Sequence, residues 1–410
     1  MTLQNDRTGE GPLCGVLRIL EIGHFVAAPF CCRLLADLGA DVIKIEPPSG
    51  DPVRGWGEQR DGHSLWWSVH GRNKRSVAVN LKSEDGRQVA LDLAHSCDVV
   101  VENFRPGHLA RLGLSDEALR GDNPDRIIAH ISGFGQDGPY RDRPAFGVIG
   151  EAMGGMRHLT NHPPQESDLP PVRVGFSIGD SLAGMYTAIG ILAALAGRRT
   201  EGAATRTIDV ALTESVLSLM EGMLPEYSAL GVVREPAGSR LKSTAPTSTY
   251  PSAEGDWVLI AANSDLLFAR LFELMERPDL LADPRYATNE ARVANVETLD
   301  AAITAWSRVL STADILAVLD RGKVPSSKIF TIADCAEDPQ YRARGMVREV
   351  SDPTLGPLLH PGIVPRINEM PGGIRWTGPE VGAHTDEVLI GLLGYSSAQL
   401  NALRDGNAVA

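Results

Sequence analysis

The residue best suited to covalent chemistry is Asp180, a single carboxylate among small residues at the start of a long apolar run. The stretch 174–185 reads VGFSIGDSLAGM, and no other acidic residue follows before Glu201. Asp and Ser often cap helices, because their oxygens accept the unpaired amide protons of the first turn. Asp180 is therefore either a helix cap or a carboxylate nucleophile that the positive end of a helix keeps ionised. The local sequence leaves both interpretations open.

Basic and aromatic side chains gather in two further segments, next to predicted strands. The first segment contributes Asn73, Lys74, Arg75 and Lys82, and the second contributes Asn103, Phe104, Arg105 and Arg111. Guanidinium and ammonium groups bind phosphate, and a phenyl ring can stack on a base. Together these segments fit an adenosine phosphate, although each one alone is more typical of a solvated loop. His24 follows the first strand and is either a ligand contact or an ordinary loop histidine.

Alternating strands and helices account for the first third of the chain. Apolar runs at 16–22, 41–46, 76–81, 98–102 and 126–131 predict strands, and 27–38 and 83–96 predict helices. This pattern is typical of a doubly wound parallel sheet covered by helices. Ligands bind such sheets beyond the carboxyl ends of strands, where His24, Glu46, Asn103 and Ser132-Gly133 are expected. Neither a GxGxxG fingerprint after the first strand nor a Walker A motif is present, which disfavours a dinucleotide or P-loop site.

The remaining chain predicts a smaller α+β unit between helical and irregular segments. Two helical runs, 182–198 and 210–226, precede a linker at 234–249, and a strand at 257–262 comes before helices at 266–275, 298–310 and 312–320. After 340 the chain is rich in Pro and Gly and ends with a helix at 386–393 and a polar tail. We expect a large domain with linker helices over 1–227, a small domain over 228–330, and a C-terminal segment over 331–410.

Composition narrows the class of protein. The 410 residues are 43% hydrophobic and 22% charged, and a net charge of −13 argues against nucleic acid as the main partner. Five cysteines, two of them adjacent, do not form a disulfide framework, and without CxxC or HExxH no metal site is expected. The N-terminus lacks the features of a signal peptide, and the apolar run 182–195 is short for a membrane span. We therefore expect a reduced, cytoplasmic protein that does not associate with a membrane.

Six segments stand out in order along the chain, at 20–29, 35–46, 73–76, 102–107, 132–139 and 179–185, followed by a closing segment at 378–386. Together they resemble the motifs of the family III CoA-transferases, which include formyl-CoA transferase, carnitine CoA-transferase and alpha-methylacyl-CoA racemase. The resemblance implies a Rossmann-like large domain with a parallel sheet, built from both chain ends, and a smaller α+β domain reached by long linkers. It also implies an interlaced homodimer.

The resemblance also implies that Asp180 is the nucleophile and that coenzyme A is a co-substrate. The carboxylate would attack an acyl-CoA thioester, whose thiolate departs readily, to give an aspartyl anhydride and then an enzyme–CoA thioester. Gly154-Gly155 could supply oxyanion donors. CoA would be held by Val26, Ala27, Val79, Asn80, Leu81, Lys82, Asn103, Phe104, Arg105, Arg111 and the loop from Arg143 to Phe146.

Departures from the family pattern bear on the reaction. Racemase members carry a His-Asp pair where this chain has Phe146-Gly147, and a Glu near the place of Ser264, so the acid and base that racemisation needs are missing. Transferase members often carry an acid at the place of Gly147 and Gln at that of Val26, and no polyglycine lid lies near 250–255. We predict CoA transfer from an acyl-CoA to a small carboxylic acid, both unspecified. The alternatives are a racemase or epimerase, and a CoA-binding protein without turnover.

Overall fold

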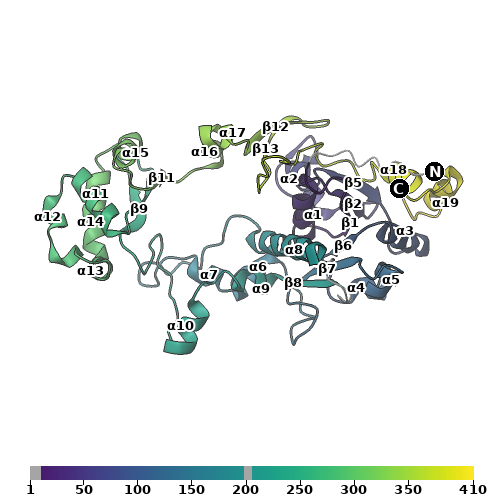
Figure 1. Cartoon of the computed structure of the whole chain (residues 1–410), viewed down its shortest axis with the longest axis horizontal. Helices are drawn as coiled ribbons and strands as arrows, with labels where there is room; N and C mark the ends of the chain where they lie inside the picture. Colours follow the sequence, from purple (N-terminus) through teal and green to yellow (C-terminus); the bar gives the residue numbers. More distant parts are fainter. Residues whose placement is uncertain (1–10, 198–205) are drawn as a thin grey trace. The chain divides into compact units, whose positions relative to one another are not determined.

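The computed structural model describes residues 11–197 and 206–410, which divide into two compact units (Figure 1). The first unit combines the chain up to Met156 with Val174–Leu230 and Pro339–Ala410. The second unit combines Arg157–Arg173 with Gly231–Asp338. Each unit has its own sheet and its own hydrophobic core.

The first unit is built on a six-stranded parallel sheet in the order β5-β2-β1-β6-β7-β8. Its strands are β1 (Arg18–Ile22), β2 (Asp41–Glu46), β5 (Lys74–Ala78), β6 (Val99–Glu102), β7 (Ile127–Ser132) and β8 (Thr207–Ala211). The predicted α/β class with a parallel sheet is confirmed. The strand order reverses between β1 and β6, so the crevice at their carboxyl ends is the expected place for a ligand.

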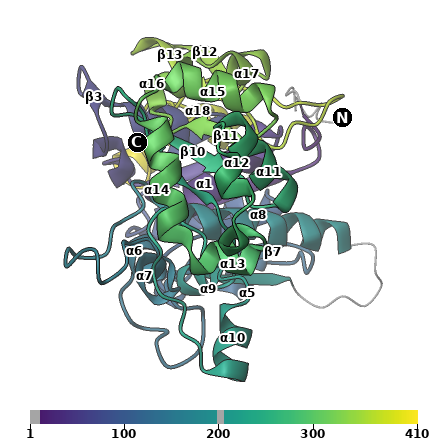
Figure 2. The same ribbon diagram turned by 90° about the vertical axis from the view of Figure 1, so that its left-hand side faces the viewer.

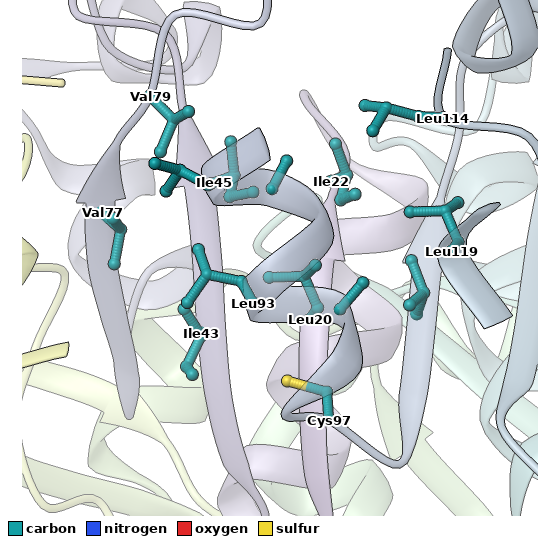
Figure 3. Close-up of a cluster of buried hydrophobic side chains, with 14 of the residues drawn as sticks. Leu20, Ile22, Ile43, Ile45, Val77, Val79, Leu93, Cys97, Leu114 and Leu119 are labelled. Atoms are coloured by element: carbon teal, nitrogen blue, oxygen red, sulfur yellow. The ribbon is translucent and has the colours of Figure 1, made fainter. Parts of the chain in front are cut away.

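Helices cover both faces of this sheet, which explains why side chains of the central strands β1, β2, β6 and β7 are buried on both faces. One face packs against α1 (Ala27–Asp37), α8 (Ile178–Ala196) and α9 (Leu212–Leu217). The other packs against α3 (Glu84–His95), α5 (Asp116–Arg120), α18 (Thr385–Gly391) and α19 (Ser397–Asp405). Figure 3 shows the second core, where Leu93 of α3 lies over Leu20 of β1 and Ile43 of β2.

Shorter elements complete the first unit. Its helices include α2 (Leu65–His70), α4 (His108–Arg111), α6 (Gly147–Met153), α10 (Met223–Leu230) and α17 (Pro339–Ala343), with the 3-10 turn η1 (Pro52–Gly55). Two antiparallel hairpins pair β3 (Gln59–Arg60) with β4 (His63–Ser64) and β12 (Val347–Asp352) with β13 (Gly356–Pro361). The helix α7 (Met156–Leu159) begins at the last residue of the first segment of this unit.

The outer edge of β5 is covered by the C-terminal segment. The Asn73 amide donates to the Trp376 carbonyl (3.1 Å), and the His384 amide donates to the Ser76 carbonyl (2.9 Å). Beyond the strand, Val79 forms an antiparallel bridge with Val409. A sheet edge that would otherwise present unpaired backbone groups is thereby closed.

The second unit contains the antiparallel sheet β11-β10-β9 and a group of helices (Figure 2). Its strands are β9 (Thr247–Pro251), β10 (Trp257–Ala261) and β11 (Ser326–Lys328). Its helices are α11 (Asp265–Leu274), α12 (Pro278–Leu281), α13 (Asn289–Ala294), α14 (Val296–Ser307), α15 (Thr312–Arg321) and α16 (Ile332–Glu337), with the 3-10 turn η3 (Pro284–Tyr286). Aromatic side chains from the strands and α11 fill the core, which includes Tyr250, Phe268 and Phe272.

Several predicted elements differ from the structure. The single helix predicted over 210–226 is wrong, because Ile208 and Val210 pair with β7 as the sixth strand and two shorter helices follow. The predicted strand 76–81 lies at Lys74–Ala78, and β9 begins inside the predicted linker. The predicted polar tail contains the helix α19, which was not predicted, and neither was the hairpin β12–β13. The predicted end of the helix at 198 and the break at 200–203 lie outside the described residues.

Among the described residues, α8 is long and apolar enough to cross a membrane by length and composition, and the bent pair α14–α15 would be a second candidate. Core helices of soluble proteins pass the same test. In this chain α8 packs against α1 and against strands β7 and β8.

Candidate active site

The loops that follow β1 and β6 are joined by one side chain, that of Asn103. The His24 amide donates to Asn103 Oδ1 (2.9 Å), and Asn103 Nδ2 donates to the His24 carbonyl (2.9 Å). Gly23 is required at this junction, because a Cβ there would lie 2.8 Å from Asn103 Oδ1. Since these loops diverge where the strand order reverses, Asn103 fixes the mouth of the crevice.

A pocket of about 360 Å³ opens at this crevice, and Asp180 lies in its wall. Predicted residues from five separate segments line it, namely His24, Ala27, Asn103, Phe104, Arg105, Ser132, Gly133, Arg143, Pro144, Ala145, Phe146 and Asp180. Its other lining residues are Phe25, Pro106, His108, Ile131 and Leu212. The fold thus brings the candidate nucleophile together with part of the predicted CoA site.

Asp180 lies in the first turn of α8 and is partly buried. The N-cap residue is Ser177, and its side chain makes no capping hydrogen bond, so the interpretation of Asp180 as the N-cap is wrong. An acid in the first turn still experiences the partial positive charge of the helix start. This position favours the ionised carboxylate that a nucleophile needs.

Two glycines bring the starts of α6 and α8 into backbone contact beside Asp180. A Cβ on Gly147 would lie 2.0 Å from Asp180 Oδ2, and a Cβ on Gly179 would lie 2.6 Å from the Gly147 carbonyl oxygen. Atoms cannot approach so closely, so a side chain at either position would displace the carboxylate or its helix. Asp180 can therefore occupy its position only because residue 147 has no side chain, which explains why this chain carries no acid there.

Aromatic and basic side chains form part of the pocket wall. The Phe104 ring lies 5.0 Å from that of His24 and 5.1 Å from that of His108, with the second pair nearly parallel at 24°. Burial lowers the pKa of His24, and the carboxylate of Asp51 offsets this only partly, so the imidazole is neutral at pH 7. The Arg143 guanidinium lies 3.8 Å from the centre of the Tyr140 ring.

A buried ion network lies beneath the β1–α1 loop. Lys44 Nζ lies 2.7 Å from Glu21 and 2.8 Å from Asp51, and it donates to the Gly23 carbonyl (2.8 Å). Asp51 Oδ1 in turn accepts from the Phe25 amide (3.1 Å), whose residue has a φ of +62°. Burial alone would lower the pKa of Lys44, but the carboxylates of Asp51 and Glu21 outweigh burial and raise it. The network therefore holds the loop in an unusual backbone conformation.

The sequence reasoning missed Glu21, Lys44 and Asp51 as supports of this loop. A usable signal was present, because Glu21 and Lys44 interrupt otherwise apolar strands whose side chains are buried on both faces. Charges in such strands are seldom buried unless they are paired. Their partners could be named only once β1 and β2 were known to be neighbours.

The predicted cluster Asn73, Lys74 and Arg75 does not reach the pocket lining. Lys74 Nζ pairs with Glu21 (2.7 Å) and donates to the Pro29 carbonyl (2.8 Å). Asn73 Nδ2 donates to Asp37 (2.9 Å), and Arg75 pairs with Asp41 (2.7 Å). These side chains have structural partners within the first unit.

The other predicted CoA contacts also lie off the pocket lining. Val26 and Val79 are buried in the first unit, and Asn80 Nδ2 donates to the Asn407 carbonyl (3.1 Å). Leu81 and Lys82 follow β5 at the edge of the sheet, and Arg111 is an exposed residue that ends α4. The suggested oxyanion donor Gly154 already donates its amide to the Gly150 carbonyl (2.8 Å). In the described part of the chain, no group of three His, Cys, Asp or Glu residues could hold a metal ion.

Comparisons with known proteins agree with this arrangement. The chain is 45% identical to the succinyl-CoA–D-citramalate CoA-transferase of Chloroflexus aurantiacus, over 95% of this chain and 96% of that protein. It is 33% identical to the formyl-CoA:oxalate CoA-transferase of Streptomyces avermitilis, over 96% of this chain and 98% of that one. A crystal structure of a CAIB/BAIF family protein from Brucella suis superposes with a TM-score of 0.82 at 33% identity, covering 93% of this chain and all of that one.

A match to a family model covers most of the chain, not only the short motifs. Residues 14–385 match the family described as CoA-transferase family III. This span takes in the parallel sheet, the pocket with Asp180 and the whole second unit. The chain belongs to CoA-transferase family III.

Proposed function

We propose that this protein transfers CoA from an acyl-CoA donor to a free carboxylic acid, with Asp180 as the nucleophile. The observation that carries the proposal is the placement of the Asp180 carboxylate in the wall of the pocket at the β1–β6 crevice. Membership of CoA-transferase family III supports the reaction class. The helix start at Asp180 supports an ionised carboxylate on a rigid mount.

The reaction can proceed in four balanced steps. An Asp180 oxygen attacks the thioester carbonyl, the C–S bond breaks, and CoA leaves as a thiolate, so that Asp180 and the donor acyl group form a mixed anhydride. The thiolate attacks the aspartyl carbonyl, which releases the donor acid and leaves an enzyme–CoA thioester. The acceptor carboxylate attacks this thioester and again expels the thiolate, forming a second anhydride. The thiolate then attacks the acceptor acyl carbon, giving the new acyl-CoA and free Asp180, so the thioester energy is retained throughout.

Succinyl-CoA is the donor we propose, and a small dicarboxylic acid of the citramalate or malate type is the acceptor. The names of three relatives support this choice, since they include succinyl-CoA with D-citramalate, L-malate and mesaconate. Arg105 and Arg143 in the pocket lining supply guanidinium groups that can pair with a second carboxylate. Initial rates with succinyl-CoA, measured against a panel of mono- and dicarboxylic acids, test the choice of substrates.

The nucleophile can be tested by trapping. After incubation with succinyl-CoA, hydroxylamine should convert Asp180 to a hydroxamate that mass spectrometry locates on the corresponding peptide. Asp180→Asn should abolish both the label and CoA transfer, whereas Asp142→Asn, at an acid whose side chain is 81% exposed, should affect neither. Transfer that survives in Asp180→Ala would refute the proposal. Exchange of an α-hydrogen for deuterium without CoA transfer would instead support the racemase alternative.

We also propose that the protein acts as a homodimer. Large apolar side chains on α8 and α10 support this, because Ile189, Leu224, Tyr227 and Leu230 are 60%, 59%, 61% and 75% exposed. Apolar surfaces of this kind are typical of interfaces. Sedimentation should give twice the mass of the chain, and a monomer with full activity would contradict the proposal.

The five free cysteines are consistent with a cytoplasmic location.

A further inference from the structure

A second polar cluster, formed by Glu102, His130 and Asp116, lies beneath the β6–α4 loop. Glu102 and His130 are register partners on the adjacent strands β6 and β7, and both are buried. His130 Nδ1 lies 2.5 Å from Glu102 Oε1, and His130 Nε2 lies 3.1 Å from the carboxylate of Asp116 at the start of α5. One imidazole ring thus links the adjacent strands β6 and β7 to α5, a helix that lies between them in the sequence.

The geometry determines the charge of this histidine. An ionised carboxylate only accepts hydrogen bonds, and a neutral imidazole carries a single N–H. With carboxylates at both nitrogens, the ring must carry two protons. Burial alone would lower the pKa of His130, but the hydrogen bonds to Asp116 and Glu102 outweigh burial and raise it to about 10. His130 is therefore an imidazolium throughout the neutral range.

Glu102 also contacts the loop that lines the pocket. Its second oxygen, Oε2, accepts a hydrogen bond from the Phe104 amide at 2.7 Å. The residue between them, Asn103, holds both backbone groups of His24, and the rings of Phe104 and His24 lie 5.0 Å apart. Asn103, Phe104 and Arg105 all line the pocket that contains Asp180. The conformation of this wall therefore depends on the Glu102 carboxylate staying in place.

Other charged groups face the cluster from the elements around it. A cavity of about 340 Å³ beside His130 admits solvent to the ring, and its lining includes the basic residues Arg105, His108 and Arg141. Arg120, on the same helix as Asp116, lowers the pKa of that carboxyl after the larger contribution of the His130 hydrogen bond. The only acids among the residues that line this cavity are Glu102 and Asp116, the two that bind His130.

We propose that His130 is a positioning residue for acyl-CoA binding: its imidazolium holds Glu102, and Glu102 holds the Phe104 amide and thereby the pocket wall from Asn103 to Arg105. The proposal rests on the proposed function, because it takes this pocket as the acyl-CoA site. It assigns His130 no contact with substrate. It also makes binding depend on the protonation of a group that lies outside the pocket.

Two substitutions separate the two hydrogen bonds of the ring. The Asn side-chain nitrogen occupies the place of His Nδ1, so His130→Asn keeps a donor for Glu102. The Gln side-chain nitrogen occupies the place of His Nε2, so His130→Gln keeps a donor for Asp116 only. We expect the Kd of an unreactive succinyl-CoA thioether analogue to rise on the order of 10-fold in His130→Gln, because a charged hydrogen bond is lost, and less than about 3-fold in His130→Asn. The KM for succinyl-CoA should follow the Kd, with kcat at saturation changing less.

Equal weakening in the two folded variants, or none in His130→Gln, would overturn the proposal. Absence of thioether binding by the unsubstituted protein would instead refute the proposed function.

A pH profile gives a test that does not need a substitution in the buried ring. The thioether has no thiol, so its own binding groups do not titrate between pH 8 and 11. Binding to the unsubstituted protein should weaken near pH 10, because the neutral ring has a single proton that Glu102 and Asp116 share. Asp116→Asn, at a side chain that is 44% exposed, removes one of the carboxylates that stabilise the imidazolium and should move this weakening to lower pH by about one unit or more. An unchanged midpoint in this variant would overturn the role of His130.

Discussion

Two buried polar clusters lie under the loops that line the pocket, one on each side of the point where the strand order reverses. Under the β1–α1 loop, Lys44 is held by Glu21 and Asp51, and all three side chains are almost completely buried. Under the β6–α4 loop, His130 is held by Glu102 and by Asp116, which is 44% exposed. In each cluster a cation lies between two carboxylates, and one of the carboxylates accepts from a backbone amide of the loop above it. In the first cluster Glu21 also pairs with a second cation, Lys74.

The difference between the clusters is in their cations. The carboxylates of Asp51 and Glu21 outweigh burial and raise the pKa of Lys44, so this ammonium group stays charged over the whole working range of a protein. The His130 imidazolium has a pKa of about 10, so it loses its proton at a pH that binding and unfolding experiments can reach. One loop is thus fixed regardless of pH, and the other is fixed only while a titratable group keeps its charge.

The largest effect should come from the cluster that does not titrate. Lys44→Met leaves Asp51 buried without its cation and Glu21 paired with Lys74 alone, and breaking a buried pair in this way costs about 3–5 kcal/mol of unfolding free energy. Urea denaturation measures the loss. Lys82→Met, at an exposed lysine, is the matched control and should change stability by less than about 0.5 kcal/mol. A loss below about 1 kcal/mol in Lys44→Met would mean that the network does not stabilise the fold.

Unlike the Lys44 cluster, the His130 cluster should contribute an unfolding free energy that depends on pH. Its folded-state pKa is raised from 6.5 to about 10, so its stabilisation is complete below pH 6.5 and is lost as pH rises through 10. The advantage of the unsubstituted protein over His130→Asn should shrink by up to about 1.4 kcal/mol for each pH unit in this window. Unfolding titrations between pH 6 and 11 measure it. An advantage that stays constant with pH would show that the ring is not charged.

Asp180 differs from the two loops, because a close backbone contact at Gly147 places it rather than an ion cluster. Gly147→Ala puts a methyl group where Asp180 Oδ2 lies and should reduce CoA transfer by about 10²-fold, the cost expected of moving a reacting group by roughly 1 Å. Thioether binding should be retained, because the loops held by the two ion clusters are unchanged. Gly175→Ala, where a Cβ meets nothing within 4 Å, is the control. Full activity in Gly147→Ala would show that Asp180 need not occupy its observed position.

The smallest effect should come from Asn103, which joins the two loops. Asn103→Asp keeps an acceptor for the His24 amide but places a carboxylate oxygen against the His24 carbonyl, at a cost of about 1–2 kcal/mol. The loss should be smaller below pH 4, where the new carboxyl group is protonated and can donate. Equal losses at pH 3.5 and pH 7 in urea denaturation would contradict this explanation.

Much of the first unit could be predicted from sequence because its strands are buried on both faces. The apolar runs of β1, β2, β6 and β7 are visible without any knowledge of neighbours, and the rule for parallel sheets then places His24 and Asn103 at the crevice. Strand β8 was missed because Thr207–Ala211 alternates with polar residues and runs directly into α9. Its pairing with β7, rather than its composition, makes it a strand.

The candidate site was predictable only in part, for related reasons. Asp180 was singled out by a motif, whereas its contact with Gly147 depends on how two helices cross and leaves no trace in either segment. The cations at 74 and 75 were assigned to a ligand because their carboxylate partners, Glu21 and Asp41, lie on other strands. Charges from distant segments can be paired correctly only after the order of the strands is known.

The covering of β5 by the C-terminal segment has a consequence for biosynthesis. The strand leaves the ribosome early, but the backbone groups that close its outer edge belong to residues 376–410, which are made only after the entire second unit. Until then the nascent chain carries an open strand edge next to a largely formed sheet, which is a site for aberrant pairing between chains on a polysome. Chaperone occupancy during translation should therefore persist on this protein until the last segment emerges, and removal of residues 396–410 should lower the soluble yield far more than a deletion of equal length in a surface loop.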